Sequence, residues 1–238
     1  MSSNTSNVDK REELNEYWCN RWANGNTGWV LPGVNPFLKL YFTVLTGGQN
    51  FCEKRVLVPL CGKTPDLLWL CEQGLSVTGI EFADMPIIDF FKEMGLSYKF
   101  NEENGYKMYV CVEKDITIYQ GDFFLMNVDI LGGLFDFCWD INSLSAMIPD
   151  EQQIYVDKLV SFLSSNAHII LNCFEYDVAL RGGNPPHVIF RNRLEKMFGS
   201  SFIYEELCRN TEDKLPEGLT IRIGADAQHV YYFLKKQS

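Results

Sequence analysis

The sequence has no uninterrupted apolar run of about 18 residues, the length that spans a bilayer as a helix, and it opens on polar residues without the apolar core of a signal sequence. Its 238 residues include 21 Lys and Arg against 31 Asp and Glu, a formal net charge of -10. A negative field repels nucleic-acid phosphates and anionic lipid headgroups. We therefore expect a cytoplasmic protein that binds small molecules and neither nucleic acid nor membrane.

Metal-ligand spacing is also missing. The eight cysteines are scattered without a Cys-x-x-Cys pair, and there are only three histidines. Paired cysteine spacings mark zinc sites and disulfide scaffolds, so we expect free thiols and no metal. No internal repeat divides the chain. We expect one domain over residues 1–238, acting as a monomer, with residues 1–10 disordered and residues 11–50 forming a helical cover.

What is present is an alternation of helix and strand patterns. Apolar side chains at helical spacing predict helices over residues 12–22 and 36–46, before the first strand. From Arg55 onward, predicted helices (64–73, 86–94, 150–163 and 190–198) alternate with predicted strands (55–59, 76–80, 106–112, 116–120, 135–139, 168–174, 202–208 and 230–234). Such alternation is typical of the α/β class, in which a parallel sheet carries helices on its faces.

The first predicted strand ends in a turn with a single glycine, Gly62, and Glu81 follows 19 positions later. Glycine lets the backbone approach a ligand, and an acidic residue about 20 positions on can accept hydrogen bonds from both ribose hydroxyls. A dinucleotide-binding loop has three glycines that accommodate a pyrophosphate. The single glycine therefore favours a nucleoside without a pyrophosphate.

Carboxylates and aromatic residues follow several predicted strands. Ligands of open α/β sheets bind beyond the carboxyl ends of the strands. An adenosyl group needs an acceptor for its ribose diol, which Glu81 supplies, and a partner for the adenine amine, which Asp122 supplies. Phe82 and Phe123 offer apolar faces around the adenine ring, and Asp140 follows a further strand.

In these residues the chain resembles the thiopurine S-methyltransferase family, a branch of the Rossmann-like S-adenosylmethionine-dependent methyltransferases. The resemblance runs from about residue 15 to about residue 200. It is carried by Trp18-x3-Trp22-x2-Gly25-Asn26-Thr27-x-Trp29, Pro59-Leu60-Cys61-Gly62-Lys63, Gly79-Ile80-Glu81, Trp139-Asp140, Tyr176-Asp177 and Gly183-x-Pro185-Pro186. It implies a class I methyltransferase fold with a seven-stranded, mostly parallel sheet flanked by helices. The implied cofactor is S-adenosylmethionine and the product S-adenosylhomocysteine.

The resemblance also implies roles for single residues. The segment from Trp18 through Trp22 to Trp29 wraps the cofactor, and Trp29 also faces the acceptor. A sulfonium is a cation, and aromatic faces attract cations. The remaining implied contacts are Leu60, Gly62, Glu81, Phe82, Asp122, Phe123 and Asp140 for the cofactor, and Tyr176 and Pro186 for the acceptor. Arg222 is a further candidate for the acceptor that the resemblance does not align.

Asp140 is also the candidate catalytic residue, as the group that orients the acceptor or receives its proton. After the Trp-Asp pair the thiopurine enzymes have an arginine, whereas this chain has Ile141. Losing a guanidinium removes charge-assisted contacts, so we expect an anionic acceptor to bind less well. Arg222 could supply charge from another direction.

The sequence thus favours S-adenosylmethionine-dependent methyl transfer to a small acceptor, and a thiol is the first candidate for that acceptor. Methylation of a halide or metalloid ion, and a non-catalytic relative that only binds the nucleoside, remain alternatives. A further alternative is an NAD-dependent oxidoreductase, although the first loop of this chain lacks the glycines that NAD binding needs.

The sequence leaves the roles of two residues undecided. Lys63 is either a solvated charge or a partner of a carboxylate such as Asp140. His187 is either a surface loop residue or a proton acceptor near the substrate.

Overall fold

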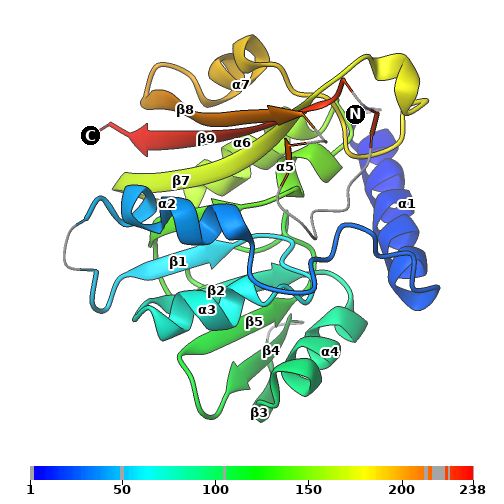
Figure 1. The fold of residues 1–238 in the computed structure, drawn as a ribbon. Coiled ribbons are helices and arrows are strands. Elements are labelled where there is room, and N and C mark those ends of the chain that lie inside the picture. Colours follow the sequence, from blue (N-terminus) through cyan, green and yellow to red (C-terminus); the bar gives the residue numbers. More distant parts are fainter. Residues whose placement is uncertain are drawn as a thin grey trace.

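In the computed structural model, residues 3–48, 51–103, 106–211, 214–215, 223–224 and 226–237 are described. The strands are β1 (Arg55–Val58), β2 (Ser76–Glu81), β3 (Tyr98–Glu103), β4 (Tyr106–Cys111), β5 (Ile116–Gln120), β6 (Phe135–Asp140), β7 (Leu163–Glu175), β8 (Phe202–Thr211) and β9 (Gln228–Lys236). Over these residues they form one nine-stranded sheet in the order β3-β4-β5-β2-β1-β6-β7-β9-β8 (Figure 1).

Most of these strands run in one direction. Strand β1 pairs in parallel with β2 and β6, and parallel pairing continues to β5 and β7. Strand β4 is antiparallel to β3 and β5, and β9 is antiparallel to β7 and β8. Within the described sheet only β4 and β9 therefore oppose the rest, which confirms the α/β class and the mostly parallel sheet.

The strand number differs from the seven that the resemblance implied. Strand β3 was not among the predicted strands because its sequence, YKFNEE, is mostly polar. It forms an edge hairpin with β4, and backbone pairing at a sheet edge needs no continuous apolar pattern.

The helices are α1 (Ser3–Ala23), α2 (Pro36–Thr46), α3 (Asp66–Glu72), α4 (Asp84–Met94), α5 (Ser143–Ala146), α6 (Gln152–Ser161) and α7 (Arg191–Phe198), with a 3-10 turn η1 (Val178–Leu180). Helix α2 begins where the Asn35 side chain accepts from the Phe37 N–H, and it ends at Gly47 in the left-handed conformation. Helix α1 begins at Ser3, inside the segment expected to be disordered, since no glycine or proline interrupts the chain before Gly25. None of the described helices is long and apolar enough to cross a membrane.

Alternate residues of the central strands supply two apolar cores, one on each face of the sheet. Val56 packs in one core with side chains of α2, α3 and α4. Leu57, the next residue of β1, packs in the other with side chains of α5, α6 and α7. Because successive strand side chains point to opposite faces, the central strands are buried on both sides, as the near-continuous apolar sequence of β1 predicts.

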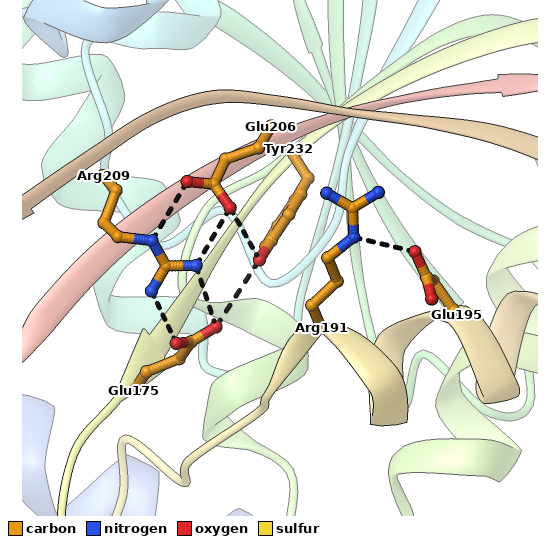
Figure 2. Close-up of polar contacts among 6 residues, drawn as sticks. All are labelled: Glu175, Arg191, Glu195, Glu206, Arg209 and Tyr232. Carbon is orange, nitrogen blue, oxygen red and sulfur yellow. Dashed lines mark hydrogen bonds and ion pairs between the residues drawn. The ribbon is translucent and has the colours of Figure 1, made fainter.

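A polar cluster joins the three strands β7, β9 and β8 near the carboxyl end of β7 (Figure 2). Nη1 of Arg209 lies 2.6 Å from Glu175, and Nη2 lies 2.9 Å from Glu206. The Tyr232 hydroxyl lies 3.5 Å from both carboxylates. This cluster holds the end of β7, where the loop toward residue 187 begins.

The strand order also fixes where a ligand can enter. From β1 the chain proceeds to β2 and β5 on one side, then crosses back to β6 and β7 on the other. The loops that follow β1 and β6 therefore leave the sheet in different directions and open a crevice at their carboxyl ends. Helix α1 lies beside the edge toward which β1 and β2 point (Figure 1).

Candidate active site

A cavity of about 300 Å³ lies at this crevice. The sheet contributes Leu60 and Gly62 after β1 and Glu81 at the end of β2, and the far end is lined from β7 and β9. The opposite wall comes from α1 and the loop that follows it, with Trp18, Trp22 and Trp29. The structure thus brings together the first loop, the acidic residue and the aromatic segment that the sequence singled out.

Glu81 is held rigidly at the cavity wall. One carboxylate oxygen accepts from the Gly62 N–H at 2.9 Å and the other from the Ala83 N–H at 2.8 Å. Burial raises the pKa of Glu81, and these backbone bonds act in the opposite direction. A carboxylate has about four lone-pair positions, so acceptor capacity remains for a ligand beside these backbone donors.

Position 62 requires glycine for two reasons, its backbone conformation and the closeness of a neighbouring side chain. Its φ is +53°, and a Cβ at this position would lie 2.9 Å from Cζ2 of Trp22. The cavity-lining Leu60 also has a positive φ, 44°. A non-glycine residue held in this region costs conformational energy and is often found at functional sites. The loop after β1 therefore has a backbone shape that brings Trp22 directly against it.

Three indole rings form the aromatic wall. The Trp29 ring lies edge to face with Trp18 at 5.0 Å and with Trp22 at 5.4 Å between centroids. The Arg21 guanidinium lies 4.9 Å from the Trp29 centroid. The indole N–H of Trp18 is buried and has no hydrogen-bond partner among the described residues. The wall offers apolar ring surface and one free donor to a ligand.

Asp66 stabilises the cavity from beneath, and the sequence had given it no role. Its two oxygens accept from the Asn35 N–H at 2.7 Å and from Nε1 of Trp139 at 2.8 Å. Asp66 is among the residues that carry the family resemblance, but an acidic residue in the first turn of a helix is common, so no role was assigned to it. Asp66 joins the loop before α2 to the end of β6.

Asp140 lies elsewhere. It is 1% exposed and does not line the cavity. One oxygen accepts from the Tyr155 hydroxyl at 2.8 Å and the other from the Leu144 N–H at 3.4 Å. Burial raises the pKa of Asp140 to about 6. Its side chain is directed toward α6 and the start of α5, and its contact with cofactor or acceptor stays a prediction.

Of the other predicted site residues, some line the cavity and some do not. Phe82 and Pro186 line the cavity. Tyr176 does not, and its hydroxyl donates to the carbonyl of Pro186, so it positions that proline. Asp122 accepts from the Phe124 N–H at 2.9 Å, and Phe123 stacks on Tyr155 at 4.9 Å. Neither Asp122 nor Phe123 lines the cavity, so their place beside an adenine stays a prediction. Arg222 lies outside the described residues.

The structure decides the two open cases. Lys63 pairs with Glu93 at 2.7 Å and Asp89 at 3.6 Å on α4, so its partner is not Asp140. His187 is buried rather than on the surface, and it does not line the cavity. Burial, followed by the charge of Arg181, lowers its pKa.

Sequence reasoning missed part of the cavity wall. His229 and Arg181 line the cavity, as do Asn142 and Asn172, whose side chains bond to one another at 3.0 Å. These residues lie in β7, β9 and loops without a recognisable motif. No group of three or more potential metal ligands is found among the described residues.

The fold defines the class of protein. A structure of a Burkholderia thailandensis 1,6-didemethyltoxoflavin-N1-methyltransferase with bound S-adenosylhomocysteine matches at a TM-score of 0.62 and 13% identity, covering 97% of this chain and 90% of that chain. The N-methyltransferase NodS of Bradyrhizobium japonicum matches at 0.58 and 13% identity, with 86% and 89% covered. The chain therefore has the fold of the class I S-adenosylmethionine-dependent methyltransferases.

The family follows from the sequence comparison. The model of the thiopurine S-methyltransferase (TPMT) family matches residues 14–236. A probable thiopurine S-methyltransferase of Danio rerio is 34% identical over 202 residues, covering 83% of this chain and 84% of the relative. The thiopurine S-methyltransferase of Pseudomonas paraeruginosa is 34% identical over 194 residues, with 82% and 86% covered. The chain belongs to the thiopurine S-methyltransferase family and is an S-adenosylmethionine-dependent methyltransferase.

Proposed function

We propose that this enzyme methylates a small thiol within the cavity. The observation that carries the proposal is the position of Glu81, an anchored carboxylate with free lone pairs, on the same cavity as the three tryptophans. Glu81 binds the ribose diol of the cofactor, and the three tryptophans surround its sulfonium.

The residues present fit S-adenosylmethionine. Glu81 would accept from its ribose hydroxyls, and the positive φ of Gly62 lets the backbone approach the nucleoside closely. The unpartnered indole N–H of Trp18 would donate to an acceptor on the amino-acid tail. Trp22 and Trp29 would present their rings to the sulfonium, an attraction of roughly 0.5–2 kcal/mol.

When bound, S-adenosylmethionine supplies a methyl group to the thiol sulfur, and the electron pair of the broken bond remains on the cofactor sulfur, which becomes neutral. The protein's contribution is to hold the acceptor in line and to exclude water. Positioning of this kind can supply roughly 7–11 kcal/mol. The two acidic residues of the described wall, Glu81 and Asp66, both accept hydrogen bonds from the protein. The thiol enters the cavity as the thiolate, having lost its proton to solvent before it binds, which suits thiols of low pKa.

Calorimetry followed by a turnover assay tests this proposal. S-adenosylhomocysteine should bind with one site per chain, and NAD should not. Transfer of a radiolabelled methyl group is then measured to a panel of aromatic and aliphatic thiols, with iodide and arsenite as the non-thiol acceptors. Binding of NAD alone would favour the oxidoreductase alternative. Binding of S-adenosylhomocysteine without turnover of any acceptor would favour the non-catalytic alternative.

A further inference from the structure

Arg181 is the basic residue of the cavity that has a buried guanidinium nitrogen without a hydrogen-bond partner among the described residues. Three Lys or Arg side chains line the cavity in the described part of the chain. Arg21 donates from Nε to the Asn26 carbonyl and from Nη1 to the Tyr17 hydroxyl, both at 2.9 Å, and it stacks on Trp29. Lys63 pairs with carboxylates of α4. Arg181 pairs with no carboxylate among the described residues.

The Arg181 side chain is held in place although its charge is not compensated. Its Nη2 donates to the carbonyl of Pro185, the neighbour of Pro186 on the cavity wall. Its Nε is buried and has no hydrogen-bond partner among the described residues. A buried charged donor without an acceptor is costly, so this nitrogen is expected to find its acceptor on a ligand.

Other arginines of the same region show the contrast. Figure 2 shows Arg209 between Glu175 and Glu206, and Arg191 beside Glu195. Each of these guanidiniums has a carboxylate partner outside the cavity. Arg181 differs from both because it lines the cavity and has a free Nε. Pairing with surface carboxylates therefore does not explain its position.

Arg181 also lies at the end of the cavity away from the ribose carboxylate. Glu81 ends β2, whereas Arg181 follows the end of β7, and β1 and β6 lie between these strands. Three inter-strand steps of about 4.8 Å separate the two strands by roughly 14 Å. The end of the cavity lined from β7 and β9 combines apolar side chains, such as Phe174, with the polar side chains of Asn172 and His229. This separation excludes the ribose as the partner of Arg181, and the calorimetry described below distinguishes the acceptor from the carboxylate of the cofactor.

We propose that Arg181 is a specificity residue that binds an anionic group, such as a carboxylate, on the methyl acceptor. This inference rests on the proposed function, since it names the class of thiol that the cavity receives. The acceptor has a flat apolar body that fits among Ile141 and Phe174, a sulfur directed toward the cofactor, and a negative group at the other end. Arg181 thus provides the positive charge that Ile141 does not, and the expectation that anionic acceptors bind poorly is reversed.

A pair of thiols that differ in one charge tests the proposal. We would compare 4-mercaptobenzoate with 4-mercaptobenzamide, which keeps the shape and the thiol but loses the negative charge. The wild-type enzyme should methylate the benzoate with a kcat/KM at least tenfold above that of the amide, with the difference mainly in KM. Arg181→Met should reduce this ratio to about one, and Arg181→Lys should retain part of it. Arg191→Met, which removes an exposed arginine outside the cavity, should leave the ratio at its wild-type value.

Calorimetry separates failure of this inference from failure of the proposed function. Binding of S-adenosylhomocysteine should be the same within about twofold in all four proteins, and 4-mercaptobenzoate should bind the wild-type complex more tightly than the amide does. If methyl transfer proceeds with equal KM for both thiols, or Arg181→Met keeps the ratio, the role of Arg181 is overturned while the methyltransferase function stands. If the benzoate does not bind the wild-type S-adenosylhomocysteine complex, the role of Arg181 is likewise overturned. If S-adenosylhomocysteine itself does not bind, the proposed function fails.

Discussion

Glu81 and Asp140 are two buried carboxylates at the carboxyl ends of strands on either side of β1, yet they do different work. Burial raises the pKa of both side chains. Glu81 accepts from two backbone N–H groups and lines the cavity. Asp140 accepts from a tyrosine hydroxyl and a helix N–H, and it does not line the cavity. Equivalent places in the sequence pattern thus gave one ligand-binding candidate and one structural anchor.

The partners of the two carboxylates explain how each responds to change. A backbone N–H can only donate, whereas the Tyr155 hydroxyl can either donate or accept. Replacing the carboxylate by an amide is therefore unfavourable at Glu81 and tolerable at Asp140. The comparison can be tested by such substitutions.

Glu81→Gln should have the largest effect. One of its two amide atoms would be an NH2 group facing the N–H of Gly62 or Ala83, so a buried donor meets a donor. Each unpaired buried group costs roughly 1–3 kcal/mol, and we expect the free energy of unfolding to fall by about 2–6 kcal/mol. Affinity for S-adenosylhomocysteine should fall more than tenfold, measured by calorimetry at 10 °C. Asp140→Asn is the matched control and should bind within about twofold of the wild type. Equal affinities for the two variants would remove the distinction between the carboxylates.

Asp140→Asn should instead change how stability depends on pH. The pKa of Asp140 in the folded protein is about 6, above the value near 3.9 of an exposed aspartate. Between about pH 4 and 6 the folded state keeps a proton that the unfolded state has lost, so this stabilisation is greatest at low pH and is lost as the pH rises through 6. The variant lacks this loss, and its stability relative to wild type should rise by roughly 3 kcal/mol over that range. Urea unfolding at pH 4, 5, 6 and 7 measures this difference, and a difference independent of pH would contradict it.

Gly62→Ala tests the contact between the first loop and the aromatic wall, with Gly95→Ala as a matched control. Both glycines have a positive φ, +53° and +67°, but a Cβ at Gly95 meets nothing within 4 Å, whereas one at Gly62 meets Trp22 at 2.9 Å. Gly62→Ala should therefore cost about 1–3 kcal/mol more than the control, because Trp22 must move. Urea unfolding and tryptophan fluorescence measure the two effects. Similar losses in both variants would show that Trp22 does not depend on Gly62.

Lys63→Met should have the smallest effect on stability. Its partners Glu93 and Asp89 are substantially exposed, and ion pairs of this kind contribute about 0–1 kcal/mol. The loss should be further reduced in 0.5 M NaCl, because salt screens exposed charges. A loss above about 2 kcal/mol would indicate that Lys63 has a buried partner instead.

Much of the fold could be predicted because its signals are local. The apolar run of β1, the turn at Gly62 and the spacing to Glu81 lie within about 25 residues, and the periodicities of strand and helix are set by backbone geometry. The aromatic segment around Trp22 was also visible, as a helical repeat. The edge strand β3 was missed because an edge strand needs backbone pairing more than apolar side chains.

The sequence by itself determined the α/β class, its resemblance to a known family indicated a methyltransferase, and its spacing predicted Glu81 as the carboxylate that binds the ribose. Only the tertiary structure decided that Asp140 is directed into the core and that Asp66 bonds to Trp139, 73 positions further along the chain. It also decided that Arg181 reaches the cavity with a free Nε. The physical reason is that a pattern specifies which residues end a strand, but the direction of a side chain and its partners depend on elements packed from distant parts of the chain.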